Sequence, residues 1–153
     1  MEIVKLQKSE IKNALELIWF VFQEFEAPDY SEHGVSTFKD FIFFDSIIEK
    51  VNKGNLIFWG CFKLNKLVGV IAIIDINHIC LFFVKKEYQR QGIAKKLFQT
   101  VADYCKIDDN INNITVNSSP YAVEVYHHLG FKDTNTEQTV DGIRFTPMEY
   151  PIA

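Results

Sequence analysis

The sequence contains little cysteine, and its three cysteines, Cys61, Cys80 and Cys105, lie far apart. They form no Cys-x-x-Cys pair, and no histidine stands at the spacing of a metal-ligand motif. Cys80 and Cys105 fall inside apolar patterns, where cysteine usually serves as a small buried hydrophobic residue. We therefore predict neither a metal site nor a catalytic thiol.

Long hydrophobic runs and an excess of positive charge are also missing. No apolar run approaches the roughly 20 residues that a membrane-spanning helix needs. Residues 1–5 alternate apolar and charged side chains and have no signal-peptide core. The net charge of −4 gives no electrostatic reason to bind nucleic acid or an anionic membrane. We predict a cytoplasmic protein without nucleic-acid or membrane partners.

The residues that are present suit one folded core. Hydrophobic residues make up 48% and charged residues 24%, and 14 phenylalanines supply most of the aromatic content. This composition is typical of a globular protein. Repeats, low-complexity tracts and linkers are absent, and 153 residues fit one compact domain. We expect residues 1–153 to form a single domain.

Hydrophobic periodicity predicts the order of helices and strands. In chain order we expect a strand at 2–6, a helix from Ser9 to before Pro28, a loop at 29–34, a helix capped by Ser36 or Thr37 and ended by Gly54, strands at 56–64 and 67–74 around a turn at 65–66, a strand at 78–84, a helix from Gly92 through Cys105, a strand at 112–117, a helix from Pro120 to Gly130, and one or two last strands within 131–150. A meander followed by a crossover predicts an α/β (α+β) fold, with a mixed central sheet of about six to seven strands flanked by four helices.

The stretch 84–94 joins a buried strand to the start of an amphipathic helix. The start of a helix offers unpaired N–H groups and a partial positive charge, which together bind anions. Gly92 has no side chain, so a phosphate can approach the backbone closely. Arg90, Lys95 and Lys96 add positive charge around it. The stretch predicts a diphosphate-binding loop, and an ordinary connection with a solvated basic face is the alternative.

A second segment, 117–131, ends in Tyr-x-x-x-Gly-Phe (126–131), and the first contains Gln-x-x-Gly-x-Ala (89–94). In this order and separation, the two resemble the pyrophosphate-binding motif and the later strand–helix segment of the GNAT superfamily of acyl-CoA-dependent N-acetyltransferases. The stretches 78–84 and 137–148 are similar to those of a subgroup of small members. The resemblance covers nearly the whole chain. It implies a GNAT-like fold and transfer of an acetyl group from acetyl-CoA to an amine of a small molecule or protein.

The resemblance also implies how individual residues are used. The end of the third strand of the meander would bond the pantetheine arm with its backbone where it diverges from its neighbour, and one of its N–H groups would hold the oxyanion. Tyr126 would be the general acid that protonates the coenzyme A thiolate. The implied cofactor-binding residues are Phe82, Phe83, Val84, Gln89, Arg90, Gln91, Gly92, Ile93, Ala94, Lys95, Asn117, Ser119 and Tyr126.

Several of these residues have a structural alternative. Tyr126 lies on the apolar face of its helix and could be only a core aromatic residue. Asn117 could be only a turn residue at the end of a strand. Three positions depart from the family pattern: Gln89 replaces a frequent arginine, Ala94 a frequent second glycine and Ser119 a frequent asparagine. These departures affect the expected affinity for the cofactor and not the fold.

The residues that handle the acceptor amine stay open. An amine must lose a proton before it attacks, and His78 has suitable chemistry near neutral pH, so it is a candidate catalytic residue. Glu24 and Glu26 are alternatives that could instead attract a cationic acceptor. By the resemblance, the loop 27–34, with Tyr30, borders the acceptor cleft. We therefore expect Glu24, Glu26 and Tyr30 to contact the substrate.

Two other interpretations of the chain remain. A module that binds coenzyme A or acyl-CoA without catalysis would need the phosphate loop but neither Tyr126 nor a base. A purely structural or interaction protein would need both motifs to be accidental. A homodimer formed through the last strands is suggested by family analogy only.

Overall fold

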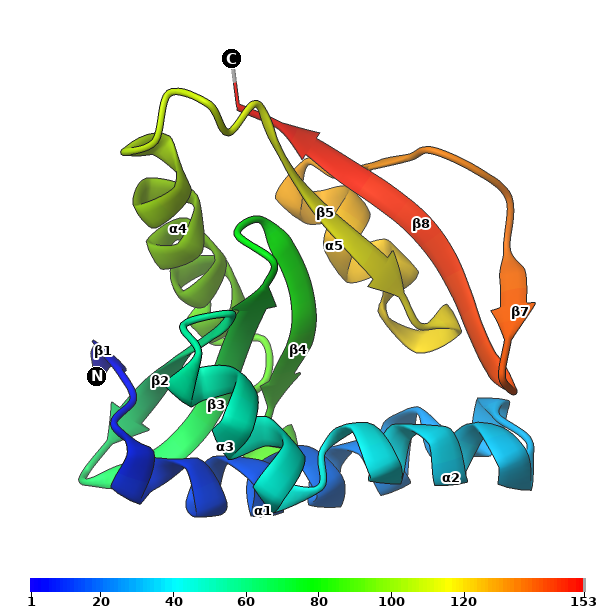
Figure 1. Ribbon diagram of the computed structural model, residues 1–153, viewed down its shortest axis with the longest axis horizontal. Helices are drawn as coiled ribbons and strands as arrows, with labels where there is room; N and C mark the ends of the chain where they lie inside the picture. Colours follow the sequence, from blue (N-terminus) through cyan, green and yellow to red (C-terminus); the bar gives the residue numbers. More distant parts are fainter. Residues whose placement is uncertain (153) are drawn as a thin grey trace.

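The computed structural model describes residues 1–152 (Figure 1). Its strands and helices are β1 (Glu2–Lys5), α1 (Lys8–Phe25), α2 (Glu32–Phe41), α3 (Phe44–Asn52), β2 (Leu56–Lys63), β3 (Lys66–Ile74), β4 (His78–Val84), α4 (Ile93–Lys106), β5 (Asn113–Ser118), α5 (Val123–Leu129), β6 (Lys132–Asp133), β7 (Gln138–Val140) and β8 (Ile143–Pro151). Short 3₁₀ helices lie between them at Ala27–Asp29, Lys86–Tyr88 and Pro120–Ala122.

The strands form a mixed sheet in the order β1-β2-β3-β4-β5-β8-β6, and β7 pairs with β8 off this path. Strands β1 to β4 are antiparallel neighbours, β4 and β5 are parallel, and β8 returns antiparallel between β5 and β6. The predicted mixed sheet of an α/β fold is thus confirmed. The described chain has eight strands and five α-helices, because β6 and β7 are too short to give a periodic pattern and because one expected helix is divided.

Helices cover both faces of the sheet, with α1, α2 and α3 on one face and α4 and α5 on the other (Figure 1). The central strands are apolar on both sides, and every residue of β3 from Leu67 to Ile73 is buried. Continuous burial is expected for a strand that is covered on both faces. Phe22 of α1 and Leu97 of α4 are fully buried in the two separate cores. These cores hold α1 and α4 on opposite sides of the sheet.

The turn between β2 and β3 lies at Leu64 and Asn65, one residue before its predicted place. Both residues have positive φ values, 51° and 63°, which a two-residue type I′ hairpin turn requires. Leu64 is 92% exposed, so its side chain has no packing role that would oppose this conformation. The position of this turn therefore follows from the backbone twist that joins β2 to β3, although the apolar Leu64 itself suggests a strand residue.

The second expected helix begins earlier than predicted and is divided in two. Its first turn is capped by Ser31, whose hydroxyl accepts a hydrogen bond from Gly34 N–H at 3.2 Å. The predicted caps Ser36 and Thr37 lie inside α2, so that prediction was wrong. Phe43 then takes an extended conformation (φ −58°, ψ 128°) and starts α3 in a new direction. The break allows α2 to contact β8 while α3 packs against α1 and β2.

The β7–β8 hairpin is docked on α2 through its backbone. Gly34 of α2 and Gly142 of the hairpin turn lie so close that a Cβ atom on Gly34 would overlap the carbonyl oxygen of Gly142. Thr37 Oγ1 donates a hydrogen bond to Asp141 O at 2.8 Å. The contact needs two residues without side chains, and it places β8 beside α2.

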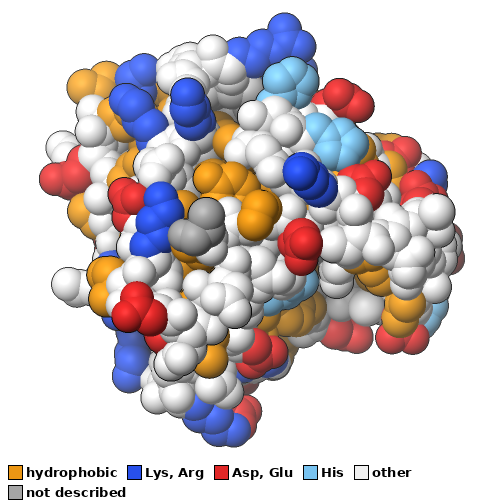
Figure 2. Space-filling model, turned by 90° about the horizontal axis from the view of Figure 1, so that it is seen from above, with side chains coloured by type: hydrophobic (Ala, Val, Ile, Leu, Met, Phe, Trp, Pro, Cys, Tyr) orange, Lys and Arg blue, Asp and Glu red, His pale blue; other side chains and the backbone are white. Residues whose placement is uncertain are grey.

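The surface carries both signs of charge. Figure 2, which views the molecule from above Figure 1, shows basic and acidic side chains interspersed, with hydrophobic side chains between them. Exposed apolar side chains include Ile107 (83%) and Tyr104 (42%) of the α4 end. None of the helices within residues 1–152 is both long enough and apolar enough to cross a membrane.

Candidate active site

Strands β4 and β5 pair only where the first two residues of β4 meet the middle of β5. The parallel register joins His78 to Thr115 and Ile79 to Val116. Beyond this point β4 continues alongside β3, whereas β5 diverges from it (Figure 1). The second half of β4 therefore has one edge without a strand partner in the described chain.

A bulge in β4 marks the point where the strands part. Ala72 of β3 pairs with Leu81, and Ile73 pairs with Ile79, so Cys80 is an extra residue in β4. Cys80 and Leu81 consequently pack on the same face of the sheet, toward α1 to α3. Bulges redirect side chains and increase the local twist. This bulge contributes to the divergence of β4 from β5.

Backbone groups of β4 point into the resulting gap. Lys85 N–H donates to Val68 O of β3 at 2.9 Å. Because N–H directions alternate along a strand, the N–H groups of Phe82 and Val84 point away from β3 and toward the gap. The carbonyl of Val84 accepts a hydrogen bond from Gln89 Nε2 at 3.0 Å. The gap is thus lined by N–H groups that a bound molecule can use.

The loop between β4 and α4 presents a row of unpaired N–H groups. From Arg90 to Lys95, no backbone N–H donates to another group of the described chain, and the last three belong to the first turn of α4, where such groups are expected. Arg90 and Gly92 have positive φ values, 63° and 82°. A Cβ atom on Gly92 would meet nothing within 4 Å. This open, positively charged end of a helix has the properties of an anion-binding site.

A cleft of about 740 Å³ extends from this loop along the open edge of β4 to α5. Its walls come from the end of α1, the second half of β4, the start of α4, and α5. Phe25 of α1 stacks on Tyr121 at a ring-centroid distance of 4.9 Å, and both rings line the cleft. The lining residues are Val21, Phe25, Glu26, Phe82, Phe83, Val84, Tyr88, Gln89, Arg90, Gly92, Ala94, Lys95, Tyr121, Ala122, Glu124, Val125, Tyr126, His128 and Leu129.

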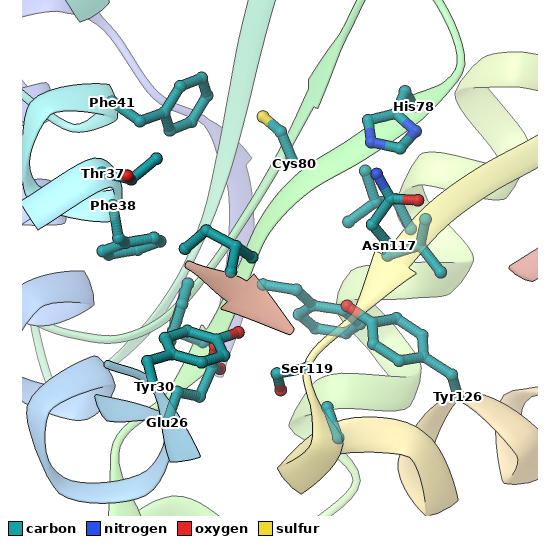
Figure 3. A pocket seen from close by; sticks show the side chains of 16 residues that line it. Glu26, Tyr30, Thr37, Phe38, Phe41, His78, Cys80, Asn117, Ser119 and Tyr126 are labelled. Carbon is teal, nitrogen blue, oxygen red and sulfur yellow. The ribbon is translucent and has the colours of Figure 1, made fainter. Parts of the chain in front are cut away.

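A smaller pocket of about 320 Å³ lies between α2, β4 and β5 (Figure 3). Thr37, Phe38 and Phe41 of α2 face His78 and Asn117 across it, and Glu26 and Tyr30 lie together on the side of Ser119 and Tyr126. The lining residues are Glu26, Tyr30, Thr37, Phe38, Phe41, His78, Ile79, Cys80, Phe82, Phe83, Val116, Asn117, Ser119, Ala122, Tyr126 and Ile143.

The larger cleft and the smaller pocket meet at Tyr126. Both cavities are lined by Glu26, Phe82, Phe83, Ala122 and Tyr126. The Tyr126 ring is held edge-on against Phe82, with centroids 6.0 Å apart, and against Phe131 at 5.3 Å. Its hydroxyl makes no hydrogen bond within the described chain. Burial, and then the nearby charge of Glu26, raises the pKa of Tyr126 above 10.0, so the phenol keeps its proton at neutral pH.

Glu26 stands at the end of α1 and borders both cavities. Burial, followed by the charge of Asp29, raises the pKa of its carboxyl from 4.5 to about 8. The Ser119 hydroxyl lowers this pKa, with a weaker effect than burial or Asp29. This hydroxyl is buried and has no hydrogen-bond partner with good geometry in the described chain. The half-buried Glu26 carboxyl and the buried Ser119 hydroxyl thus both face the junction of the cavities.

His78 and Cys80 line the smaller pocket beyond this junction. His78 Nδ1 lies 2.8 Å from Thr115 Oγ1, and burial lowers the pKa of the imidazole below 6.5. Burial raises the pKa of the Cys80 thiol to about 12. At neutral pH His78 is therefore uncharged and Cys80 is a thiol, so neither brings charge to the pocket.

Most of the expected cofactor-binding residues line the larger cleft, and these are Phe82, Phe83, Val84, Gln89, Arg90, Gly92, Ala94, Lys95 and Tyr126. Asn117 and Ser119 line the smaller pocket instead. The side chains of Gln91 and Ile93 line neither cavity: Gln91 Nε2 donates to Glu87 O at 3.1 Å, and Ile93 is 1% exposed in the core. Of these two residues, only the backbone N–H groups belong to the unpaired donors of the loop.

The expected substrate contacts fall in different places. Glu26 and Tyr30 line the smaller pocket. Glu24 lines neither cavity and forms an exposed ion pair with Lys86, with Oε1 and Nζ 3.4 Å apart. Glu26 follows the last residue of α1 and faces inward, whereas Glu24 is on the solvent side of that helix. A prediction that treated the two as equivalent missed this difference in helical phase.

Sequence reasoning also missed the aromatic walls. Phe25 and Tyr121 close the larger cleft, and Phe38 and Phe41 of α2 form one wall of the smaller pocket. Each of these residues fits an ordinary apolar pattern, and no local signal distinguishes a pocket wall from a core position. Their proximity depends on how distant elements pack.

Comparisons with known proteins bear on the same fold. The family model of the acetyltransferase (GNAT) domain matches residues 26–152. Human N-acetyltransferase 8 is 28% identical over 89 residues, an alignment that spans 50% of this chain and 39% of the human protein. The chain thus spans well under half of this relative's length.

Solved structures share the whole fold. The PaiA N-acetyltransferase of Thermoplasma acidophilum, solved in complex with coenzyme A, has a TM-score of 0.78 at 21% identity, covering 99% of this chain and 98% of that one. The spermidine N-acetyltransferase of Vibrio cholerae, in complex with coenzyme A and spermine, has a TM-score of 0.66 at 17% identity, covering 98% and 94%. At these identities the likeness concerns the fold.

Proposed function

This chain belongs to the GNAT acetyltransferase family, and on that premise we propose that it transfers an acetyl group from acetyl-CoA to a primary amine, with Tyr126 as general acid. The observation that carries the proposal is the meeting of two cavities at Tyr126. One cavity begins at the open, basic start of α4, and the lining of the other includes no residue of that loop. Two substrates entering from the two sides would meet beside the Tyr126 hydroxyl.

The larger cleft fits acetyl-CoA at both of its ends. The unpaired N–H groups from Arg90 to Lys95 and the space beside Gly92 suit a diphosphate, and the Phe82 and Val84 N–H groups suit an extended amide chain added along the open edge of β4. When bound, acetyl-CoA supplies an acetyl thioester, whose carbonyl an amine can attack. Relatives of this fold solved with coenzyme A support this assignment.

The chain's own groups would then carry the transfer. The N–H of Phe82 or Val84 would hold the charge that develops on the acetyl oxygen. Tyr126 would donate its proton to the departing sulfur as the amine nitrogen replaces that sulfur at the acetyl carbon. It would take back a proton that the new amide nitrogen releases, so the tyrosine is restored. Because the pKa of Tyr126 is raised, the phenol is fully protonated when it is needed.

The proposal covers an amine on a small molecule as well as one on a protein, and the spermidine N-acetyltransferase among the structural neighbours is an example with a small acceptor. A cytoplasmic location and a homodimer also remain predictions. No helix within residues 1–152 is long and apolar enough to span a membrane.

The proposal is tested by titrating the purified protein with acetyl-CoA while following its melting temperature. A ligand at 100 times its Kd stabilises a folded protein by about 2.7 kcal/mol, an increase that a domain of this size shows as several degrees. Thiol release is then measured with a panel of amines. Absence of a thermal shift at millimolar acetyl-CoA would contradict the proposal, and binding without turnover of any amine would favour a non-catalytic coenzyme A-binding module.

A further inference from the structure

The smaller pocket differs from a polycation site in its chemistry. Of its described lining residues, Glu26 alone has a carboxyl group, and none is lysine or arginine. Six aromatic side chains surround the remaining space: Tyr30, Phe38, Phe41, Phe82, Phe83 and Tyr126. The other polar groups are uncharged at neutral pH, His78 among them because burial lowers its pKa.

We infer that the acceptor is a small primary amine with one ionisable nitrogen and an aromatic or other apolar body, and that Glu26 receives this nitrogen and removes its proton. This inference rests on the proposed function and specifies the substrate class and the general base of the same site. The nitrogen lies at the junction with the larger cleft, and the body lies among the rings of α2 and β4.

The position of Glu26 supports its role as the base. It borders both cavities and is close enough to Tyr126 for its charge to affect the tyrosine's pKa. His78, the other candidate, precedes Phe82 by four residues of β4, which is roughly 13 Å along an extended strand. A base must reach the proton that it abstracts, directly or through one water. Glu26 meets this condition at the junction, and His78 lies toward the opposite end of the pocket.

Burial also favours the required proton transfer. An ammonium group beside a carboxylate and an amine beside a carboxylic acid differ only in which group holds one proton, and a site shielded from water disfavours the charged pair. Burial raises the pKa of Glu26 to about 8, and the same surroundings lower that of an amine from about 10.4. The proton therefore moves from nitrogen to Glu26 at low cost, and Glu26 releases it to solvent after the reaction.

The charged and titratable groups around Glu26 do not change this conclusion. Asp29 and Tyr30 face it from the following turn, Ser119 from the end of β5 and Tyr126 from α5. Asp29 raises the pKa of Glu26 further. Arg144, which donates from Nη1 to Asp29 O at 3.4 Å, is engaged by Glu137 through Nε at 3.1 Å. Glu26 thus has no cationic partner of its own in the described chain.

The apolar walls of the smaller pocket limit the acceptor to one positive charge. A second ammonium group, as in a polyamine, would lie among aromatic rings without a carboxylate, and an unpaired buried charge is strongly disfavoured. A lysine side chain on a peptide carries one charge but has only a thin methylene stem to place among the rings. An aromatic body instead makes edge and face contacts of the kind that these rings favour.

The first test measures binding without turnover. Phenethylamine, spermidine and a short lysine-containing peptide are titrated calorimetrically into the full chain saturated with coenzyme A. We expect phenethylamine to bind at least tenfold more tightly than the other two. We also expect Glu26→Gln to weaken phenethylamine binding at least tenfold and the Glu16→Gln control, the same change at an exposed position of α1, to leave it unchanged. The inference would be overturned if spermidine or the peptide bound more tightly than phenethylamine. It would also be overturned if phenethylamine bound the Glu26→Gln variant as tightly as the natural protein.

The second test follows turnover. With phenethylamine, Glu26→Gln should lower kcat at least 100-fold, with the acetyl-CoA thermal shift preserved. It should also remove the fall in kcat/KM below about pH 8 that the pKa of Glu26 predicts for the natural protein. An unchanged acidic limb in the variant would overturn the role of Glu26. Failure of acetyl-CoA to shift the melting temperature would instead contradict the proposed function, so the two failures are distinguishable.

Discussion

The two cavities that meet at Tyr126 share five lining residues, but they offer different kinds of groups to a ligand. The larger cleft offers mainly backbone groups at its ends: the N–H groups of a loop and helix start, and those of one open strand edge. The smaller pocket offers side chains from the segment that follows α1 and from α2, β4, β5, α5 and β8. Backbone recognition suits a ligand that every relative shares, whereas a side-chain pocket can differ from one relative to the next without disturbing the fold.

The largest effect is expected from a change at Tyr126, because this residue lines both cavities. Tyr126→Phe keeps the ring contacts with Phe82 and Phe131 and removes only the hydroxyl. We expect kcat for the preferred amine to fall by about 100- to 10,000-fold, the range of general acid catalysis, with acetyl-CoA binding intact. Tyr104→Phe, at the exposed end of α4, is the matched control. A kcat within threefold of the natural value would exclude Tyr126 as the acid.

The backbone character of the larger cleft can be tested at Gly92. Gly92→Glu introduces a side chain at positive φ and a negative charge into the space expected for the diphosphate. We expect acetyl-CoA binding to weaken at least about 100-fold, so that the roughly 2.7 kcal/mol of stabilisation at 100 times the natural Kd falls to about 0.4 kcal/mol or less. Gly54→Glu is the control, because Gly54 also has positive φ (77°) and open surroundings but lines neither cavity. Equal acetyl-CoA shifts in the two variants would contradict the assignment of the loop.

The Glu26 carboxyl of the smaller pocket should make the free energy of unfolding depend on pH. The pKa of Glu26 is about 8 in the folded protein against 4.5 without burial, so the folded state holds a proton that the unfolded chain has lost. The free energy of unfolding should therefore fall with rising pH between about 4.5 and 8, by at most about 1.4 kcal/mol per unit.

Glu26→Gln should remove this slope and melt above the natural protein at pH 8.5. Urea unfolding at pH 5.5, 7 and 8.5 measures the effect. Parallel profiles for the two proteins would mean that the Glu26 carboxyl is not buried in its neutral form.

The smallest effect is expected at the contact between α2 and the β7–β8 hairpin. Gly34→Ala forces the two backbones apart, at a cost of about 1–3 kcal/mol in stability. Because this contact closes the smaller pocket, KM for the amine should rise several-fold, with acetyl-CoA affinity unchanged. Ser36→Ala, exposed on the same helix, should change neither. If acetyl-CoA binding falls together with amine binding, the two cavities are not independent.

The larger cleft was largely predictable from the sequence, and the reason is local. A strand, a glycine at a helix start and nearby basic residues lie within the stretch 84–96, and their chemistry follows from chain order alone. The loop that they form has the unpaired N–H groups and the positive φ at Gly92 that such chemistry needs. The mixed sheet was predictable on the same basis, because the periodicity of each strand is local.

The smaller pocket was not predictable in this way. Its walls depend on the break between α2 and α3 at Phe43 and on a hairpin whose pairing with α2 joins residues 104 positions apart, Thr37 and Asp141. No periodic pattern reports such a contact, and Phe38 and Phe41 look like core residues in the sequence. Glu26 and Glu24 differ only in helical phase at a helix end, where boundaries are least certain.

The close contact between Gly34 and Gly142 bears on the order in which the two cavities form during synthesis. Every residue that lines the larger cleft lies at or before Leu129, whereas the smaller pocket also needs Ile143. A chain that emerges from the ribosome N-terminus first therefore contains the whole lining of the larger cleft before the last wall of the smaller pocket exists. Contacts between such distant residues also form slowly, so the smaller pocket is completed last.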